Sequence, residues 1–409
     1  MRRSNPKNRR VVVTGLGVVS SLGIGWQEFW KNLLAGKSGI SPIAAFNTDQ
    51  YDHRYGGEVK NFDPTKFMSA KHASATGRST QMAIAAAKLA LADAHIPLSR
   101  IDKRKIAVCV GTTGGERRLI ELCNRDRILN RKSMMARGSF VACTAENLAS
   151  GINMELGLQG YMSVLSTACA AGNYAIGRGF DLLRRGKSDY ALVGGADSSS
   201  QMVHTGFIRL NAVAPEQCQP FDKNRKGMIP AEGAGMLLLE PLESAKKRWA
   251  HIYAEVLGYG MSCDAYDMTD PSVTGVTKAL QKALRNSHVK ADQIDYISAH
   301  GTGTIENDAV ECQSINRVFG KRTPKIPVSS IKSMLGHTMG AASALGAIAC
   351  CLAIKDDRIP PTINHEKDDP ECKIDCVPNK SRRKKLKIVL NSSQAFGGNN
   401  ACLIIRKSN

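Results

Sequence analysis

The sequence predicts an α/β protein in which strands and helices alternate through two similar halves. Apolar runs rich in valine, isoleucine and alanine alternate with longer alanine-rich segments, which indicates a sheet covered by helices. One local pattern also occurs twice: an apolar run leads to a reactive side chain, Cys169 or His337, and a helix of small residues follows. At 409 residues the chain exceeds the usual size of one domain. We therefore expect an internal duplication, with halves at 1–255 and 256–409.

The first half begins with a short β-branched strand and a glycine turn over residues 10–23. Its glycines resemble a dinucleotide-binding fingerprint, but Ser20 stands where the third glycine should be, and no strand with an acidic end follows. A tight turn from strand to helix is therefore expected there. Strands are expected at 106–111, 162–165, 189–197 and 236–239, an alanine-rich helix at 79–94, a helix after Cys169, and a basic surface segment at 117–137.

The second half repeats this order of elements. Strands are expected at 254–259, 294–299, 327–331, 387–391 and 402–405, and helices at 275–286 and 338–354. Because the carboxyl ends of parallel strands form the ligand-binding edge of an α/β sheet, side chains just after these strands are candidates for chemistry.

The composition is that of a soluble protein with a large core, since 43% of residues are hydrophobic and 22% are charged. No continuous apolar run approaches the roughly 20 residues that span a bilayer. The basic amino end has no small-residue cleavage site after an apolar stretch, so we expect no signal peptide and a cytoplasmic location. The twelve cysteines are scattered without a Cys-x-x-Cys pair, which favours reduced thiols and argues against a metal site.

The net charge of +20 raises the question of an acidic partner. Nucleic acid is disfavoured because aromatic residues make up only 5% of the chain and do not alternate with the basic clusters. Steering of an acidic protein partner explains the charge without base recognition. The cluster from Arg125 to Lys132 is the candidate docking surface, through Arg125, Arg127 and Arg131.

Three motifs place a reactive side chain after a strand. Cys169 lies in Ser-Thr-Ala-Cys-Ala-Ala-Gly, where a Ser/Thr cap starts a helix whose dipole favours the thiolate and whose small residues leave room beside the sulfur. His300 and His337 lie among glycines, where the backbone can approach a substrate closely. A cysteine with two histidines and no metal-ligand spacing indicates thioester chemistry.

With these motifs the chain resembles the β-ketoacyl-acyl carrier protein synthases, members of the thiolase-like group. The shared motifs, in the order of that family, are Phe221-Asp-x-x-Arg225-x-Gly227, Glu232-Gly-Ala-Gly235, His300-Gly-Thr-Gly-Thr-x-x-Asn307-Asp308-x-x-Glu311, Lys332-Ser-x-x-Gly-His337 and Pro360-Pro-Thr-x-Asn364. Residues 253–262 look most like the type II elongating branch. The resemblance implies a five-layered αβαβα fold and a decarboxylative condensation of an acyl-enzyme with malonyl carrier protein, which gives a 3-ketoacyl product and CO2.

The resemblance also implies roles for single residues. Cys169 is expected to hold the acyl group, while His300 and His337 hydrogen-bond to the enolate oxygen. The backbone N–H groups of Cys169 and Phe396 form the expected oxyanion hole. Lys332 and Glu311 match an ion pair that orders the site, and a buried pair without a chemical role is an equal alternative.

The expected substrate contacts follow the same resemblance. Thr302 and Thr304 match hydroxyls that hold the pantetheine arm, Thr269 lies beside that channel, and Thr113 and Phe207 fall where the family lines its acyl pocket. No cofactor is expected besides the phosphopantetheine of an acidic acyl carrier protein. The resemblance implies either a homodimer or a heterodimer with a homologous chain-length factor.

Three departures from the family pattern surround the expected channel. Gln394 and Ala395 replace the first Phe-Gly of the usual Phe-Gly-Phe-Gly-Gly loop, Asp267 replaces a usual histidine, and Thr113 replaces a larger aliphatic residue. They leave two alternatives to fatty-acid elongation. One is a ketosynthase subunit of a type II polyketide or polyene pathway. The other is a non-catalytic carrier-protein-binding subunit, which the presence of Cys169 disfavours.

Overall fold

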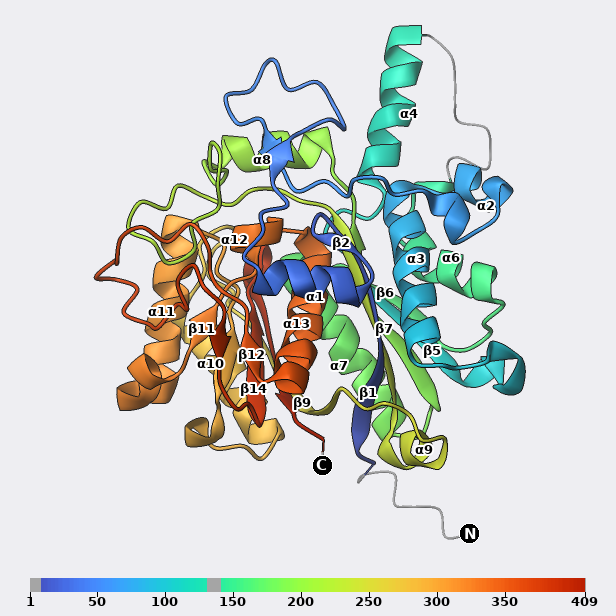
Figure 1. The fold of residues 1–409 in the computed structure, drawn as a ribbon. Coiled ribbons are helices and arrows are strands. Elements are labelled where there is room, and N and C mark those ends of the chain that lie inside the picture. Colours follow the sequence, from blue (N-terminus) through green and yellow to red (C-terminus); the bar gives the residue numbers. More distant parts are fainter. Residues whose placement is uncertain (1–8, 131–140, 409) are drawn as a thin grey trace.

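The computed structural model describes residues 9–130 and 141–408, which form a layered α/β protein (Figure 1). Its strands are β1 (Val11–Ser20), β2 (Gly23–Ile24), β3 (Ser41–Pro42), β4 (Tyr55–Gly56), β5 (Ile106–Gly111), β6 (Met162–Leu165), β7 (Tyr190–Asp197), β8 (Gly233–Pro241), β9 (Ala254–Cys263), β10 (Tyr296–Ser298), β11 (Val328–Ser329), β12 (Arg358–Ile359), β13 (Arg382–Arg383), β14 (Ile388–Ser393) and β15 (Asn399–Arg406). Its α-helices are α1 (Trp26–Leu34), α2 (Ala70–Ala75), α3 (Arg78–Asp93), α4 (Arg117–Asn130), α6 (Asn147–Leu156), α7 (Ala171–Arg184), α8 (Gln201–Arg209), α9 (Leu242–Lys247), α10 (Val273–Asn286), α11 (Ile305–Phe319), α12 (Lys332–Leu335) and α13 (Ala342–Asp356).

The central strands show the predicted duplication directly. The first half has the strand order β6-β5-β7-β8-β1, and the second has β11-β10-β14-β15-β9. In each half the first three strands are parallel, and the last two continue the sheet in antiparallel fashion. The halves meet where the start of β1 pairs antiparallel with β9, from Val11 opposite Val256 to Val13 opposite Ala254. The expected boundary after residue 255 falls inside β9.

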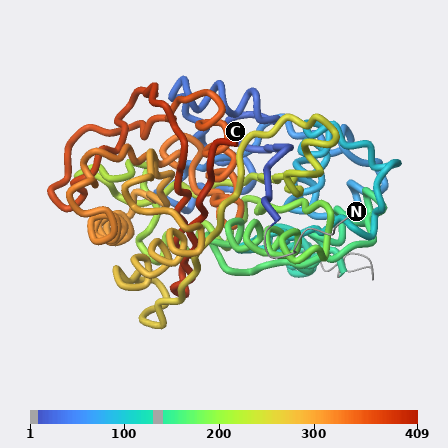
Figure 2. Tube along the Cα trace, turned by 90° about the horizontal axis from the view of Figure 1, so that it is seen from below, coloured from blue at the N-terminus to red at the C-terminus, as the bar shows by residue number. Residues whose placement is uncertain are grey.

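Helices separate and cover the two halves of the sheet. Helices α7 and α13 pack against each other and against strands of both halves, so they form the middle layer. Helices α3 and α6 cover the outer face of the first half, and α10 and α11 cover that of the second. Figure 2 shows the cyan and green part of the chain on one side and the orange and red part on the other. The predicted five-layered αβαβα arrangement is therefore confirmed.

Strand β1 differs from the prediction of a glycine turn. It continues through Gly15 and Gly17, and all ten of its residues are buried. A Cβ atom at Gly17 would lie 1.8 Å from the carbonyl oxygen of Ala86 in α3, and one at Gly15 would lie 2.1 Å from that of Ala90. Because these glycines have no side chain, an alanine-rich helix can contact the strand backbone. Close packing of this kind explains glycine in a strand as well as a turn does.

The middle layer contains the most apolar helix of the protein. The helical stretch Met339–Asp356 is long and apolar enough to cross a membrane by length and composition alone, and 89% of it is buried inside the protein. A helix was expected at 338–354, but alanine and glycine dilute its apolar character, so the sequence did not indicate a stretch that could cross a membrane. Its burial between the two halves of the sheet accounts for its composition.

Candidate active site

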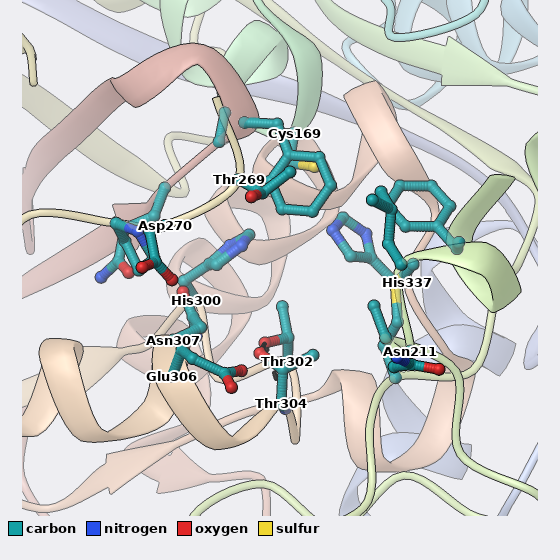
Figure 3. A pocket seen from close by; sticks show the side chains of 18 residues that line it. Cys169, Asn211, Thr269, Asp270, His300, Thr302, Thr304, Glu306, Asn307 and His337 are labelled. Atoms are coloured by element: carbon teal, nitrogen blue, oxygen red, sulfur yellow. Dashed lines mark hydrogen bonds between the residues drawn. The ribbon is translucent and has the colours of Figure 1, made fainter. Parts of the chain in front are cut away.

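A cavity of about 360 Å3 lies where segments of both halves converge (Figure 3). Cys169 follows β6 of the first half, whereas His300 follows β10 and His337 follows β11 and α12 of the second. The cavity is lined by Cys169, Phe207, Leu210, Asn211, Ala212, Met228, Thr269, Asp270, Pro271, His300, Thr302, Thr304, Glu306, Asn307, His337, Gln394, Ala395 and Phe396. Most of the residues singled out from the sequence are therefore brought together.

A sharp backbone turn presents Cys169 to the cavity. Ala168 has a φ of 48°, and a short 3₁₀ turn, η5 (Ala168–Ala170), leads into α7. This left-handed conformation is costly for a residue other than glycine and lets the chain reverse within one step. The hydroxyl of Ser393, the last residue of β14, donates to the Cys169 carbonyl at 3.0 Å. The expected Ser/Thr cap is wrong, because Thr167 makes no capping hydrogen bond through its side chain.

The Cys169 side chain is buried, with 6% of its surface exposed. Burial raises the pKa of its thiol to about 12, although the charge of Lys332 acts in the opposite direction. Desolvation is the largest cause of this shift, and it opposes the thiolate that the helix start was expected to favour. In the free protein the thiol keeps its proton at neutral pH, so the proton has to leave as the sulfur reacts.

His300 and His337 form a pair of neutral imidazoles beside Cys169 (Figure 3). Their ring centroids are 5.5 Å apart at an interplanar angle of 83°. Burial is the main cause that holds the pKa of each ring well below its usual value, and Lys332 adds to it. The Met339 N–H donates to Nδ1 of His337 at 3.1 Å, and Nζ of Lys332 lies 3.4 Å from Nδ1 of His300. Each ring therefore has its proton on Nε2 and can donate from there.

Lys332 and Glu311 hold His300 through its backbone. Lys332 donates to the His300 carbonyl, and the Glu311 carboxylate accepts from the N–H groups of His300 at 2.8 Å and Gly301 at 2.7 Å. Among the described residues Lys332 and Glu311 form no direct ion pair, and each instead holds the His300 backbone. The two charges interact at longer range, where Lys332 lowers the pKa of Glu311 and Glu311 raises that of Lys332. Burial raises the pKa of Glu311 to about 7, while those two hydrogen bonds lower it.

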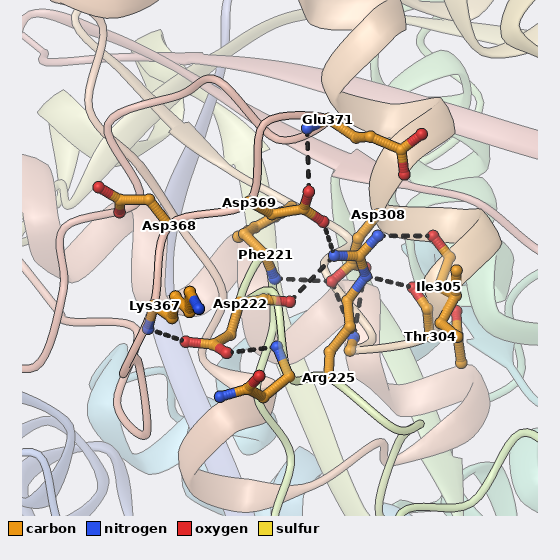
Figure 4. A network of polar contacts seen from close by, with 12 residues as sticks. Phe221, Asp222, Arg225, Thr304, Ile305, Asp308, Lys367, Asp368, Asp369 and Glu371 are labelled. Carbon is orange, nitrogen blue, oxygen red and sulfur yellow. Dashed lines mark hydrogen bonds and ion pairs between the residues drawn. The ribbon is translucent and has the colours of Figure 1, made fainter.

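A second buried network fixes the loop that contains Thr302 and Thr304 (Figure 4). Asp308 accepts from the N–H groups of Thr302 at 3.0 Å and Phe221 at 2.8 Å. Arg225 forms an ion pair with Asp369 and donates to the Thr304 carbonyl at 3.3 Å. The Thr302 and Thr304 hydroxyls are 2.8 Å apart, and both residues line the cavity. The motifs around Phe221 and Asp308 thus act as supports for this loop.

The remaining predicted residues divide into two groups. Phe207 and Phe396 line the cavity, and their ring centroids are 5.6 Å apart. Thr269 also lines it, and its N–H donates to Asp267 at 2.7 Å, so the acidic replacement at Asp267 shapes this loop. Thr113 is not among the residues that line this cavity, and its assignment to the acyl pocket stays a prediction.

The backbone of Thr113 is fixed by a buried carboxylate, that of Asp197. Its N–H donates to Asp197 at 2.8 Å, and Asp197 also accepts from the N–H of Gly340 at 2.7 Å. A Cβ atom at Gly340 would lie 2.7 Å from the Thr113 nitrogen, so the two segments are in close contact. The position of Thr113 depends on this long-range contact, which no local pattern indicates.

Several cavity residues were missed by the sequence analysis: Leu210, Asn211, Ala212, Met228, Asp270, Pro271 and Glu306. Only two of them had a usable signal, since Met228 follows the Gly227 motif and Glu306 precedes the Asn307-Asp308 motif. The others come from loops whose course is set by tertiary contacts.

The fold and this site define a thiolase-like condensing enzyme, and comparisons with known proteins agree. Residues 8–245 match the family described as beta-ketoacyl synthase, N-terminal domain, and residues 253–366 match the corresponding C-terminal domain family. The chain therefore belongs to the β-ketoacyl synthase family.

Relatives and solved structures match nearly the whole chain. It is 38% identical to the 3-oxoacyl-(acyl-carrier-protein) synthase 2 of Synechocystis sp. over 99% of both chains, and 37% identical to that of Coxiella burnetii over 98% of this chain and 99% of the relative. The solved ishigamide ketosynthase/chain length factor has a TM-score of 0.95 at 43% identity, covering 98% of this chain and 100% of that one. A ketosynthase solved in complex with its type II PKS acyl-carrier protein has a TM-score of 0.89 at 32% identity, with the same coverage.

Proposed function

We propose that this protein condenses an acyl group held on Cys169 with malonyl carrier protein, releasing CO2 and a 3-ketoacyl carrier protein. The main supporting observation is that one cavity contains a buried thiol from the first half and two neutral Nε2 donors from the second. A thiol is a strong nucleophile and, in a thioester, a good leaving group. Neutral N–H donors stabilise an enolate oxygen without giving up a full proton.

The first step transfers the acyl group to the enzyme. The Cys169 sulfur attacks the acyl carbon of the carrier-protein thioester, while the thiol proton passes to the departing carrier thiolate. The backbone N–H groups of Cys169 and Phe396 stabilise the tetrahedral oxygen. The Ser393 hydroxyl fixes the Cys169 carbonyl, which belongs to the peptide next to the one that carries this N–H.

The second step generates the carbon nucleophile. The bond between the malonyl carboxylate and its methylene breaks, CO2 leaves, and the electron pair is delocalised onto the malonyl thioester oxygen. His300 and His337 donate to that oxygen through Nε2. The carbanion then attacks the acyl carbon on Cys169, and the expelled thiolate takes a proton from solvent. Thr302, Thr304 and Thr269 contact the pantetheine arm of the carrier protein. Because this arm belongs to the substrate, the enzyme needs no cofactor of its own.

The partner in this proposal is an acidic acyl carrier protein that docks beside the cavity. Arg125 and Arg127 are exposed on α4, whereas Arg131 lies outside the described residues. Glu121 of α4 accepts from the Ser200 hydroxyl at the start of α8 at 2.6 Å, and α8 provides Phe207 to the cavity. The basic helix is thus tied to α8 through Glu121 and projects from the same side of the molecule as α8 (Figure 1). The solved relative in complex with its carrier protein supports this kind of partner.

A second candidate function is the same reaction in a type II polyketide or polyene pathway. It is favoured by the 43% identity to the ishigamide ketosynthase/chain length factor, against 38% to the Synechocystis synthase. In this case the chain pairs with a chain-length-factor homologue, whereas in fatty-acid elongation it forms a homodimer. In both cases we place the enzyme in the cytoplasm.

The test is incubation with a panel of acyl-loaded carrier proteins, followed by intact mass of the enzyme. We expect the wild-type chain to gain the acyl mass and Cys169→Ala to gain none. His300→Ala and His337→Ala should still become acylated but form no 3-ketoacyl product with malonyl carrier protein. Acylation that persists in Cys169→Ala contradicts the proposal.

A further inference from the structure

The side chain of Gln394 lines the active-site cavity without a polar partner. Only 2% of the residue is exposed. Neither Nε2 nor Oε1 has a hydrogen-bond partner within residues 9–130 and 141–408. The carboxamide has two N–H donors and one oxygen acceptor, and all of them are removed from water.

Two buried amides close to it in the sequence are paired. Three residues earlier, Nδ2 of Asn391 donates to Oδ1 of Asn173 at 2.9 Å and to the Ser343 carbonyl at 2.8 Å. After the same loop, Asn400 donates to Asp264 at 2.6 Å. Because a buried polar group without a partner carries an uncompensated desolvation cost, an unpaired amide is a feature that needs an explanation. A polar group supplied by a substrate provides one.

Gln394 lies on the segment that holds the Cys169 backbone, and both residues line the same cavity. It directly follows Ser393, whose hydroxyl holds the Cys169 carbonyl at 3.0 Å, and it precedes Phe396 by two residues. Ala395 has ordinary extended backbone angles of φ −151° and ψ 150°, so its replacement of glycine introduces no strain there. A group recognised by Gln394 is therefore close to the thioester and far from the distal end of a long acyl chain.

We propose that Gln394 determines acyl specificity by hydrogen bonding to an oxygen substituent near the thioester carbon of the acyl chain. This inference rests on the proposed condensation. A chain of carbon and hydrogen alone leaves the carboxamide unpaired, whereas a 3-hydroxyl group can accept from Nε2 and donate to Oε1. A 3-keto oxygen can satisfy Nε2 only. The enzyme thus favours oxygenated acyl chains over saturated chains of equal length.

The test compares three acyl groups of equal length on one carrier protein: saturated, 3-hydroxy and 3-keto. The measured quantity is kcat/KM for condensation with malonyl carrier protein, for the wild type and for Gln394→Met. Methionine has a similar length and no strong donor or acceptor. We expect Gln394→Met to lower kcat/KM about 10- to 100-fold for the oxygenated chains and to leave the saturated chain unchanged or faster. The ratio of kcat/KM for the 3-hydroxy chain to kcat/KM for the 3-keto chain identifies the oxygen group that Gln394 prefers.

Two controls separate specificity from folding. Gln281→Met makes the same chemical change on an exposed face of α10 and should leave all three values unchanged. The Tm of Gln394→Met should equal or exceed that of the wild type, because the variant removes an unpaired buried amide.

Several outcomes overturn the inference. An unchanged preference in Gln394→Met does so, and so does an equal loss for all three chains. A loss confined to the KM of malonyl carrier protein assigns the amide to the malonyl carboxylate, which also overturns the acyl assignment. If the wild type condenses none of the chains, the proposed function itself fails, and this result is distinct from a wild type that condenses them without preference.

Discussion

Single residues of the active site are held in their uncharged or weakly charged forms by burial. Burial raises the pKa of Cys169 and Glu311 and lowers those of His300 and His337. The same desolvation therefore keeps a proton on the thiol and removes one from each imidazolium. This combination suits a reaction in which the sulfur loses its proton only as it attacks, while the rings donate hydrogen bonds as neutral groups.

The pKa of about 12 for Cys169 predicts how alkylation depends on pH. Because the thiolate is the reactive form, the rate of modification by iodoacetamide should rise about tenfold per pH unit from pH 7 to 9. Peptide mass spectrometry measures the rate at Cys169, with the exposed Cys263 as an internal reference for the reagent. A rate at Cys169 that levels off below pH 9 contradicts this prediction.

Glu311 predicts a dependence of stability on pH. Its pKa is about 7 in the folded protein and close to 4.5 when unfolded, so protonation favours the folded state. This stabilisation is fully present below pH 4.5 and is lost as the pH rises through 7. Between these values the wild type should lose about 3 kcal/mol of unfolding free energy relative to Glu311→Gln. Urea unfolding of both proteins at pH 4.5, 5.5 and 7 measures this difference. A difference that stays constant with pH contradicts the assignment.

At the scale of elements, the contact between β1 and α3 depends on glycine. Gly17 lies against the Ala86 carbonyl, so any Cβ atom at this position meets backbone that cannot rotate away. Strand and helix were both expected from the sequence, but their close contact was not. A glycine in an apolar run indicates a turn and a close packing position equally well until its neighbour is known.

Gly17→Val should therefore lower the unfolding free energy by about 3 kcal/mol or more, because backbone atoms have to shift. Thermal unfolding measures the change. Gly206→Ala is the matched control, since nothing lies within 4 Å of a Cβ atom there and the position is exposed within α8. It should stabilise the protein by up to about 1 kcal/mol. Equal effects at both sites contradict the packing argument.

The elements that were predicted best are those with a strong local period or motif. The strands that precede Cys169 and His300 and the small-residue helices after Cys169 and His337 follow from such patterns. Features that depend on a distant partner were missed or wrong. The Thr167 cap is absent, Glu311 binds backbone amides and leaves Lys332 to the His300 carbonyl, and the contact of Asp197 with the Thr113 backbone had no local signal. The roles of the cavity residues in catalysis stay predictions.

At the scale of the whole molecule, two copies of one strand pattern bring unlike side chains to a shared cavity. The first copy supplies the thiol, and the second supplies both imidazoles and the Gln394 to Phe396 loop. The duplication was predicted because the Cys169 and His337 segments resemble each other locally. The strand order within each copy was not, since pairing depends on contacts across the sheet.

The surplus of positive charge predicts a docking face at one end of the molecule. Arg125→Glu with Arg127→Glu on α4 should weaken carrier-protein binding about tenfold or more at low salt, with a smaller effect as salt rises. Titration by fluorescence anisotropy measures the Kd. Lys246→Glu with Lys247→Glu, exposed on α9 at the opposite end in Figure 1, gives the same change in net charge and should leave Kd nearly unchanged. Unchanged affinity in the α4 variant, or an equal loss in both, contradicts the assignment.

The position of β1 has a consequence for protein synthesis. Only the two-residue strand β2 pairs with it locally, and its long partners β8 and β9 begin only at Gly233 and Ala254. At a translation rate of about 5 to 20 residues per second, β1 waits roughly 10 to 45 seconds for its first long partner, β8. Until then most of its ten residues, all buried in the folded protein, lack the strands that cover them. An apolar strand whose partners are synthesised this late is exposed to wrong pairing and association while the chain is being made.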